Sequence, residues 1–203
     1  MTFDEFKASP NGKIVGAILA GRASPTRYAL YLRNLVPAYR ELELGLERHR
    51  HAPGLGRLFR PELRRSSALE HDLMRLIGGD WRSTLRLLDE ADRYARRISL
   101  AAEGGGALLI AHAYTRYLGD LAGGRVLASR LATAFDLSPS GLSFYAFPEI
   151  ADVTAFRRDY RADLDVSGGA VRDLDAVVEE AALAFQLNID LSEAVQSIAL
   201  LSA

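Results

Sequence analysis

The sequence predicts an all-α fold in one domain that spans residues 1–203, and three observations support this prediction. Apolar residues recur at the three- and four-residue intervals of amphipathic helices along nearly the whole chain. The only stretch that resembles a strand, 142–147, is too short and solitary to form a sheet. The length suits one domain with a substantial core, and no internal repeat is present. We therefore expect one domain of about eight helices.

Composition narrows the kinds of site that the chain can form. It has no cysteine, which excludes disulfides, thiolate metal sites and cysteine nucleophiles. Its net charge of −1 gives no general attraction to nucleic acid or to an anionic membrane. The N-terminal residues do not combine a basic start with an apolar run, and no segment approaches ~18 uninterrupted apolar residues. We expect a cytoplasmic protein with no nucleic-acid or membrane partner.

The first long helix is expected to begin at Pro25, because Ser24 suits the N-cap position and proline suits the first helical position. Its apolar stripe predicts that one face packs into the core, and Pro37 within the stripe predicts a kink. The stripe consists of Tyr28, Leu32, Leu35, Val36, Tyr39, Leu42 and Leu46.

Two further helices are expected over about 61–79 and 84–100, before the glycine run 104–106. The inward positions of the second of these are Leu88, Ala91, Ala95 and Ile98. After a turn at 138–141, helices are expected from 148 to about 163 and from 170 to about 197, with a break at 167–169. The predicted stripe of the last helix is Val171, Leu174, Val178, Ala181, Phe185 and Asn188.

The helical segment Ala111–Leu127 carries three glycines and an aspartate. Glycine inside a helix costs about 1 kcal/mol relative to alanine, so Gly119, Gly123 and Gly124 together give up roughly 3 kcal/mol. At about 100° per residue they share one helix face with Asp120. Such a bare strip of backbone with one carboxylate could receive a flat ligand. Alternatively, the glycines only let another helix approach closely or mark a bend.

The string AHAYTRYLGDLAGGRVL at 111–127 closely resembles the signature of the biliverdin-forming heme oxygenases, where it forms the kinked distal helix over the heme. Other stretches resemble this family in its order and at its approximate separations, so the likeness covers residues 14 to 195. It implies the heme-oxygenase-like all-α fold with a kinked, glycine-rich distal helix. These stretches are 35–47, SSALEHDL at 66–73, SGLSFYAFPEI at 140–150, FRRDYRADL at 156–164 and EEAALAFQLNIDL at 179–191.

The resemblance also implies roles for individual residues. Asp120 matches the aspartate that orders a water network and delivers protons. Tyr39, Arg116 and Asn188 match residues of the same catalytic group. The residues that match the heme-contacting positions are Gly119, Gly123 and Gly124 through bare backbone, Tyr114, Arg157 and Arg161 near the propionates, and Phe185 in the pocket wall.

Simpler interpretations exist for the same residues. Asp120 could pair with an arginine, and Tyr39 could be a packing residue whose hydroxyl finds one partner. Arg157 and Arg161, at positions i and i+4, could form a solvated basic face, although two guanidinium groups in register also suit paired carboxylates. Asn188 lies on an apolar stripe, so it needs a polar partner if it is buried.

One position departs from the pattern of the family it resembles. That family holds iron through a histidine about fifteen residues before the glycine that matches Gly21, and counting back without a gap reaches Phe6. Phe6 is therefore expected at the heme site, but phenylalanine cannot ligate iron, and the metal ligand is unknown. None of the chain's histidines matches the ligand position: His49, His51, His71 and His112.

The resemblance implies oxidation of heme to biliverdin, CO and Fe²⁺, with heme as both cofactor and substrate. It further implies O₂ and an external electron donor such as a ferredoxin or flavoprotein reductase. Because Phe6 replaces the histidine, one alternative is a non-catalytic protein that binds heme or a bilin. A helical scaffold for protein partners and a di-iron oxygenase are further alternatives, although the repeated Glu-x-x-His spacing of di-iron proteins is missing.

Overall fold

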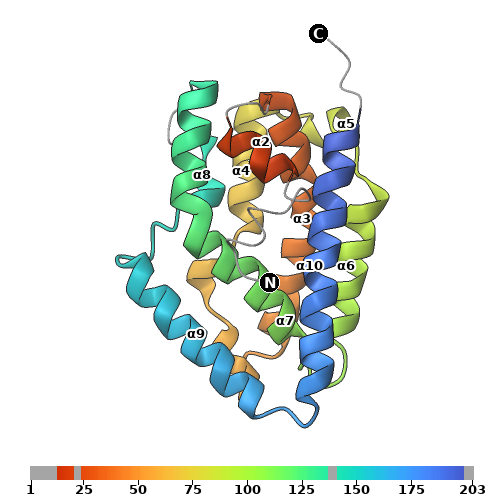
Figure 1. Cartoon of the computed structure of the whole chain (residues 1–203), viewed down its shortest axis with the longest axis vertical. Coiled ribbons are helices and arrows are strands. Elements are labelled where there is room, and N and C mark those ends of the chain that lie inside the picture. Colours follow the sequence, from red (N-terminus) through yellow and green to blue (C-terminus); the bar gives the residue numbers. More distant parts are fainter. Residues whose placement is uncertain (1–12, 21–23, 137–140, 199–203) are drawn as a thin grey trace.

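The computed structural model describes residues 13–20, 24–136 and 141–198, and every regular element within these ranges is helical (Figure 1). The all-α prediction is therefore confirmed. In chain order the elements are α2 (Lys13–Leu19), α3 (Pro25–Arg48), η1 (Leu55–Leu58), η2 (Pro61–Leu63), α4 (Ser66–Ile77), α5 (Trp81–Thr84), α6 (Asp89–Ala101), α7 (Leu109–Ala113), η3 (Tyr114–Leu118), α8 (Gly119–Phe135), η5 (Ser143–Tyr145), α9 (Val153–Gly169) and α10 (Leu174–Ser197).

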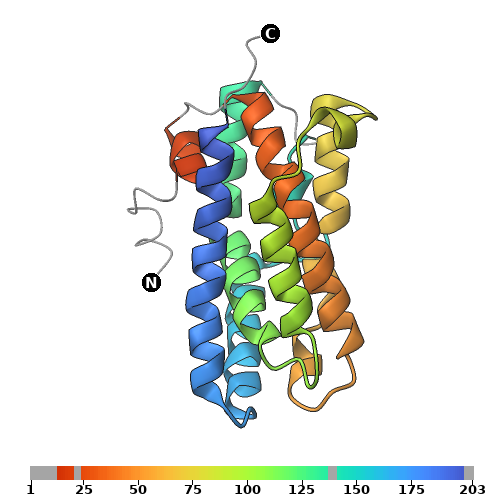
Figure 2. The ribbon, with the colours of Figure 1, turned by 90° about the vertical axis from the view of Figure 1, so that its right-hand side faces the viewer.

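The long helices α3, α6 and α10 run side by side, as both views show (Figures 1 and 2). Helix α3 also packs against α4, and α10 packs against α7 and α2. Buried apolar side chains from these helices form one continuous cluster. No helix in the described ranges is long and apolar enough to cross a membrane.

Helix α3 forms as predicted. The Ser24 hydroxyl accepts a hydrogen bond from the Arg27 amide at 3.2 Å, which caps the first turn, and Pro25 occupies the first helical position. Every member of the predicted stripe is buried. The helix continues through Pro37 without ending, and the kink expected there stays a prediction.

Helix α4 begins at Ser66, about five residues later than predicted, because its N-terminal cap comes from a distant residue. The Glu43 carboxylate on α3 accepts hydrogen bonds from the backbone amides of Arg65 at 2.6 Å and Ser66 at 2.9 Å. These amides lack partners within the helix, so a carboxylate from α3 sets where α4 starts. Pro61 opens only the short η2, while the predicted end at Gly78 is correct.

The helix predicted over 84–100 is divided by an extended segment. Helix α5 ends at Thr84, and α6 begins at Asp89. Between them, the Asn34 side chain of α3 accepts from the Leu88 amide at 2.8 Å and donates to the Arg86 carbonyl at 3.1 Å. These bonds hold residues 85–88 outside a helix. All four predicted inward positions are nevertheless buried.

The strand-like stretch 142–147 forms no strand, because Ser143–Tyr145 form the short helix η5. The buried Asp72 carboxylate on α4 accepts hydrogen bonds from the amides of Ser143 and Phe144, both at 2.8 Å. The amides of Ser143 and Phe144 therefore donate to this carboxylate and not to the backbone of a neighbouring strand. Residues 138–140 of the predicted turn lie outside the described ranges.

Both C-terminal helices begin about four or five residues later than predicted. The side chain of Asp152 caps α9, and the side chain of Asp173 caps α10. The predicted break at 167–169 is wrong in position, because these residues form the last turn of α9.

The predicted stripe of α10 is wrong in its first half, where Leu174 and Val178 are exposed. The helix instead buries a face that includes the charged residue Glu180. A stripe predicted from apolar residues alone does not include Glu180, so the sequence pattern placed the buried face of α10 on the wrong side of the helix. The buried residues include Val177, Glu180, Ala184, Leu187 and Asn188.

The glycine-containing segment is helical throughout, but it is not a uniform α-helix. Helix α7 leads into η3, which is π-helical, and η3 leads into α8. A π turn holds one residue more than an α turn, and such segments occur often at functional sites and at bends. The π segment was not predicted from the sequence, and the predicted kink stays a prediction.

Candidate functional site

A cavity of about 530 Å³ opens beside η3 and the start of α8. Helices α9 and α10 form further walls, and residues of α2, α3 and η5 complete it. A volume of this size is typical of a site for a small molecule or cofactor. The apolar lining residues are Val15, Leu118, Gly119, Ala122, Leu127, Phe144 and Phe185, and the polar ones are Tyr31, Tyr114, Thr115, Arg116, Asp120, Tyr145, Thr154, Arg157, Arg158, Arg161 and Asn188.

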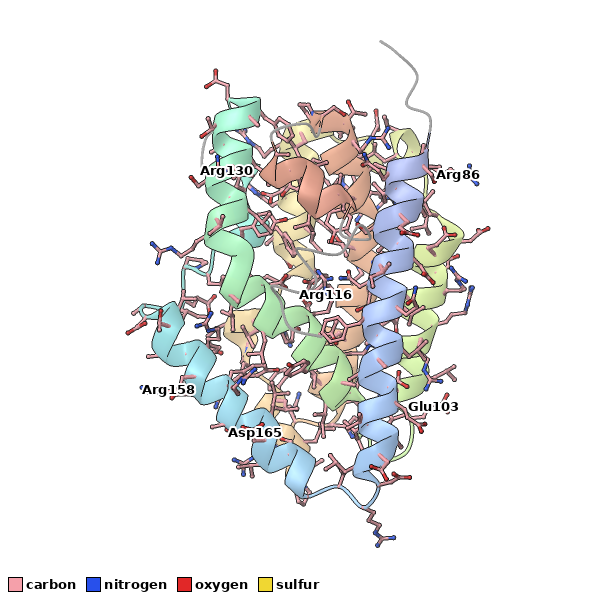
Figure 3. The ribbon with its side chains drawn as sticks, viewed as in Figure 1. Arg86, Glu103, Arg116, Arg130, Arg158 and Asp165 are labelled. Carbon is pink, nitrogen blue, oxygen red and sulfur yellow. The ribbon has the colours of Figure 1, made fainter. Side chains whose placement is uncertain are left out.

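Four predicted catalytic residues meet in one hydrogen-bonded group at the inner wall of this cavity. The Arg116 guanidinium donates to the Tyr39 hydroxyl at 2.8 and 3.0 Å and to the Asn188 side-chain carbonyl at 2.6 Å. The Tyr39 hydroxyl in turn donates to the Asp120 carboxylate. Figure 3 shows Arg116 in the interior, between the glycine-containing helix and α10. The structure therefore brings together side chains from α3, η3, α8 and α10.

Asp120 is buried, with 8% of its surface accessible, and it lies in the lining of the cavity. Its second carboxylate oxygen lies 3.7 Å from an Arg116 nitrogen, which is too far for a good hydrogen bond. Burial raises the pKa of Asp120, although the charge of Arg116, the hydrogen bond from Tyr39 and the charge of Arg65 oppose the rise. This carboxyl therefore binds a proton more readily than an exposed aspartate does.

The glycines of the segment have different surroundings. Gly119 lines the cavity, and a Cβ atom added there would meet no atom within 4 Å. A Cβ on Gly124 would instead lie 3.3 Å from the ring of Tyr145, so this glycine allows a close approach to η5. Gly123 is buried. Of the three glycines, Gly119 is the one that leaves backbone open to the cavity.

Arginines from one face of α9 line the cavity. Arg157 and Arg161 are exposed, and within the described residues neither forms an ion pair with a carboxylate. Arg158 also lines the cavity, but it pairs with Asp159 at 2.9 Å, and Figure 3 shows it at the outer edge of α9. The unpaired guanidinium groups suit an anionic ligand.

An aromatic contact joins Phe185, predicted in the pocket wall, to Tyr114, predicted near the anionic groups of the ligand. Tyr114 and Phe185 meet edge to face, with ring centroids 6.4 Å apart, and both rings line the cavity. Phe185 is half-buried. The two rings are nearly perpendicular, and both border the cavity that Asn188 also lines.

None of the histidines lies in the cavity lining, within the ranges that the structure describes. His49 bonds to the Ala102 carbonyl at 2.9 Å, and His71 bonds to Ser143 at 3.0 Å. The lining also lacks methionine. Phe6, which matches the iron-facing position, lies outside the described residues. Within the described residues, no three histidine or acidic side chains lie close enough to hold a metal ion.

His112 belongs instead to a buried ion-pair cluster. Its ring lies 2.7 Å from the Glu180 carboxylate, which also accepts two-pronged hydrogen bonds from Arg97 of α6. Burial by itself raises the pKa of Glu180, but hydrogen bonds from His112 and Arg97, with their charges, lower it to about 2. This cluster ties α6, α7 and α10 together one turn before Arg116.

Sequence reasoning missed several residues of the site. Tyr31, Phe144 and Tyr145 line the cavity but reach it through the packing of α3 and η5 against the glycine-containing helix. No spacing in the sequence marks these contacts. Glu180 was also missed, although a glutamate in the middle of a helix with apolar neighbours is a signal for a buried partner.

A family model described as heme oxygenase matches residues 4–194. The chain is 36% identical over 191 residues to human heme oxygenase 1, covering 93% of this chain and 66% of that protein. It is 34% identical over 182 residues to heme oxygenase 1 of Nostoc sp., covering 89% and 76%.

Two solved structures extend the likeness to three dimensions. Heme oxygenase-1 of Synechocystis sp., in complex with heme, gives a TM-score of 0.82 at 28% identity and covers 96% of this chain and 90% of that chain. Heme oxygenase of Leptospira interrogans gives a TM-score of 0.83 at 30% identity and covers 96% of this chain and 100% of that chain.

The ion-pair cluster predicts a pH-dependent contribution to stability. A pKa lowered from 4.5 to about 2 corresponds to roughly 3 kcal/mol of stabilisation by ionised Glu180. This contribution is complete above pH ~4.5 and is lost as pH falls toward 2. We expect Glu180→Gln to lower the free energy of unfolding by about this amount at pH 7. Urea denaturation across this pH range should show the difference from wild type shrinking with acidification. Glu179→Gln, at an exposed neighbour, should change little, and a constant difference across pH would contradict the assignment.

Proposed function

The chain belongs to the heme oxygenase family, and on this premise we propose that it binds heme in the cavity and degrades it to biliverdin, CO and Fe²⁺. The reaction would use O₂ and electrons from an external donor, with a ferredoxin or flavoprotein reductase as the expected class. The observation that carries the proposal is the group formed by Tyr39, Arg116, Asp120 and Asn188, which borders a cavity whose wall surface is mostly apolar by area. The cytoplasmic location stays a prediction.

The described residues fit a heme in shape and charge. Heme has two flat apolar faces and two carboxylates on one edge. The open space beside Gly119 lets a flat ring approach the helix backbone closely, which a larger residue would prevent. Tyr114 and Phe185 offer aromatic walls, and Arg157 and Arg161 can pair with the two carboxylates. When bound, heme would supply the iron at which O₂ is activated.

The role proposed for Asp120 is to hold a water molecule and a proton beside the bound heme. One of its oxygens accepts from Tyr39, and the other has room to accept from water in the cavity. Arg116 keeps Tyr39 in place, and Asn188 keeps Arg116 in place. The carboxyl is thus oriented before heme arrives, which is the condition for efficient proton transfer.

Asp120→Asn tests this role. The variant should bind heme with nearly unchanged affinity, while the yield of biliverdin falls about tenfold or more. Folding raises the pKa of Asp120, so the folded state favours the protonated carboxyl. The free energy of unfolding therefore decreases as rising pH ionises Asp120, and ionised Asp120 lowers stability at neutral pH. The variant should therefore unfold at the same urea concentration as wild type or a higher one. Asp163→Asn, which removes a carboxylate paired with Arg60 outside the cavity, is the control. An unchanged yield in Asp120→Asn would exclude the proposed role.

Gly119→Leu tests whether heme lies against the open backbone. Leucine is a better helix former than glycine, so stability should not fall, but its side chain would extend into the cavity. We expect heme affinity, measured by absorbance titration, to drop about tenfold or more. Ser129→Leu places the same side chain at an exposed position of α8 and should leave affinity unchanged. Equal affinities for the two variants would place heme elsewhere.

A second candidate function is heme or bilin binding without turnover. One observation favours it: the described lining of the cavity contains no histidine, cysteine or methionine that could ligate iron. The anionic oxygen ligands that this lining could offer to iron are a phenolate from Tyr31, Tyr114 or Tyr145 and the Asp120 carboxylate.

Phe6→His separates the two candidates. Wild type and variant are titrated with heme and then given reductant under air, with product identified by absorbance. We expect biliverdin from wild type and a faster reaction in the variant, because imidazole ligates both ferric and ferrous iron, whereas the oxygen ligands of the described lining favour ferric iron. Turnover by the variant alone would establish the second candidate for the natural chain. Absence of heme binding by both proteins would refute the cavity assignment itself.

A further inference from the structure

Arg65, directly before α4, is a buried cation without a carboxylate partner for its guanidinium in the described part of the chain. The residue is 5% exposed, and its guanidinium stacks on the Phe147 ring at 4.2 Å. Its hydrogen bonds go to backbone carbonyls: Glu62, Leu63, Ser143, Phe144 and Ala146. Arginine stays protonated in proteins, so a full positive charge lies inside the fold.

Asp72 binds the same loop with the opposite charge. It lies two helical turns beyond Arg65, and its carboxylate, which is fully buried, accepts from the amides of Ser143 and Phe144. Arg65 thus holds the carbonyl groups of the loop 143–146, and Asp72 holds its amide groups. Both contacts fix the loop to α4.

This loop forms part of the cavity and touches the proposed catalytic group. The Phe144 ring lines the cavity and meets the Tyr39 ring edge to face, with centroids 5.5 Å apart. Tyr145 lines the cavity as well and packs against Gly124. A shift of the loop 143–146 would therefore change the packing around Tyr39, whose hydroxyl donates to Asp120.

We propose that Arg65 is a positioning residue for the reaction, which holds the loop 143–146 against Tyr39 and adds its positive charge to the surroundings of Asp120. The Glu43 carboxylate on α3, which accepts from the Arg65 amide, is the other acidic group that faces this guanidinium. The inference rests on the proposed function, because it assigns Arg65 a role only through Asp120. The role of Arg65 differs from that of Arg116, because Arg116 donates directly to the Tyr39 hydroxyl and belongs to the hydrogen-bonded group itself.

The charges around Asp120 support this assignment. Burial raises the pKa of Asp120, and Arg65 is one of the two cations that oppose the rise, the other being Arg116. The remaining titratable groups that interact with Asp120 are phenols, and the exposed cations that share its cavity lie on α9. The phenols are Tyr31, Tyr39, Tyr94, Tyr117 and Tyr145, and the α9 cations are Arg157, Arg158 and Arg161.

The opposite charges of Arg65 and Asp72 allow a sharp test. Arg65→Gln and Asp72→Asn both weaken the hold on the loop, so both should lower the urea midpoint. Only Arg65→Gln removes a positive charge that acts on Asp120. In the heme-free protein, carbon-13 NMR of the aspartate carboxyls, assigned with Asp120→Asn, should show the pKa of Asp120 rising by about 0.5 unit or more in Arg65→Gln. In Asp72→Asn the pKa of Asp120 should stay at the wild-type value or fall.

Arg65→Lys keeps the charge but loses the planar fork of donors. It should destabilise the loop while leaving the Asp120 titration near that of wild type. This variant keeps the proposal falsifiable if Arg65→Gln does not fold, since a raised pKa of Asp120 in Arg65→Lys would overturn the charge effect. An equal shift in Arg65→Gln and Asp72→Asn would show that the loop alone acts. Because heme is absent, a failure here is separate from a failure of heme degradation.

Discussion

The guanidinium of Arg116 is the centre on which the site depends. A buried cation is costly unless its donors are satisfied, and here Tyr39 from α3 and Asn188 from α10 satisfy them. Because Tyr39 also donates to Asp120, one side chain links three helices to the carboxylate that borders the cavity. The interaction stabilises the packing of α3 and α10 against the glycine-containing helix, and it orients the acid group in the same arrangement. The bonds that join these helices are therefore the same bonds that orient the carboxylate to which we assign the proposed role.

The sequence was sufficient for the fold class and for much of the site. Periodicity identified the buried stripe of α3 that contains Tyr39, since helical spacing is local information. The resemblance of 111–127 to a known signature supplied Arg116 and Asp120, and the structure places Arg116 between Asn188 and Asp120. The roles of these residues, and of the α9 arginines, stay proposals that the experiments above address.

Interactions between distant residues account for what the sequence did not predict. Glu43 sets the start of α4, and Asn34 keeps residues 85–88 out of a helix, although both belong to α3. The burial of Glu180 turns α10 toward His112 and exposes residues that an apolar count would bury. Caps and ion pairs of this kind join positions more than twenty residues apart, and a local pattern holds no information about them.

The π segment η3 has a consequence for how this protein can change over time. A π turn corresponds to one additional residue within a helix, so a single deletion would return the segment to the more regular α form. That change would leave α8 close to its present orientation relative to α7, because a π turn takes up the extra residue within about the rotation of one α turn. In a helix without a π turn, the loss of one residue would instead rotate everything that follows by about 100°. The segment η3 is therefore a part of the helix in which length can change by one residue while Asp120 stays on the face that borders the cavity.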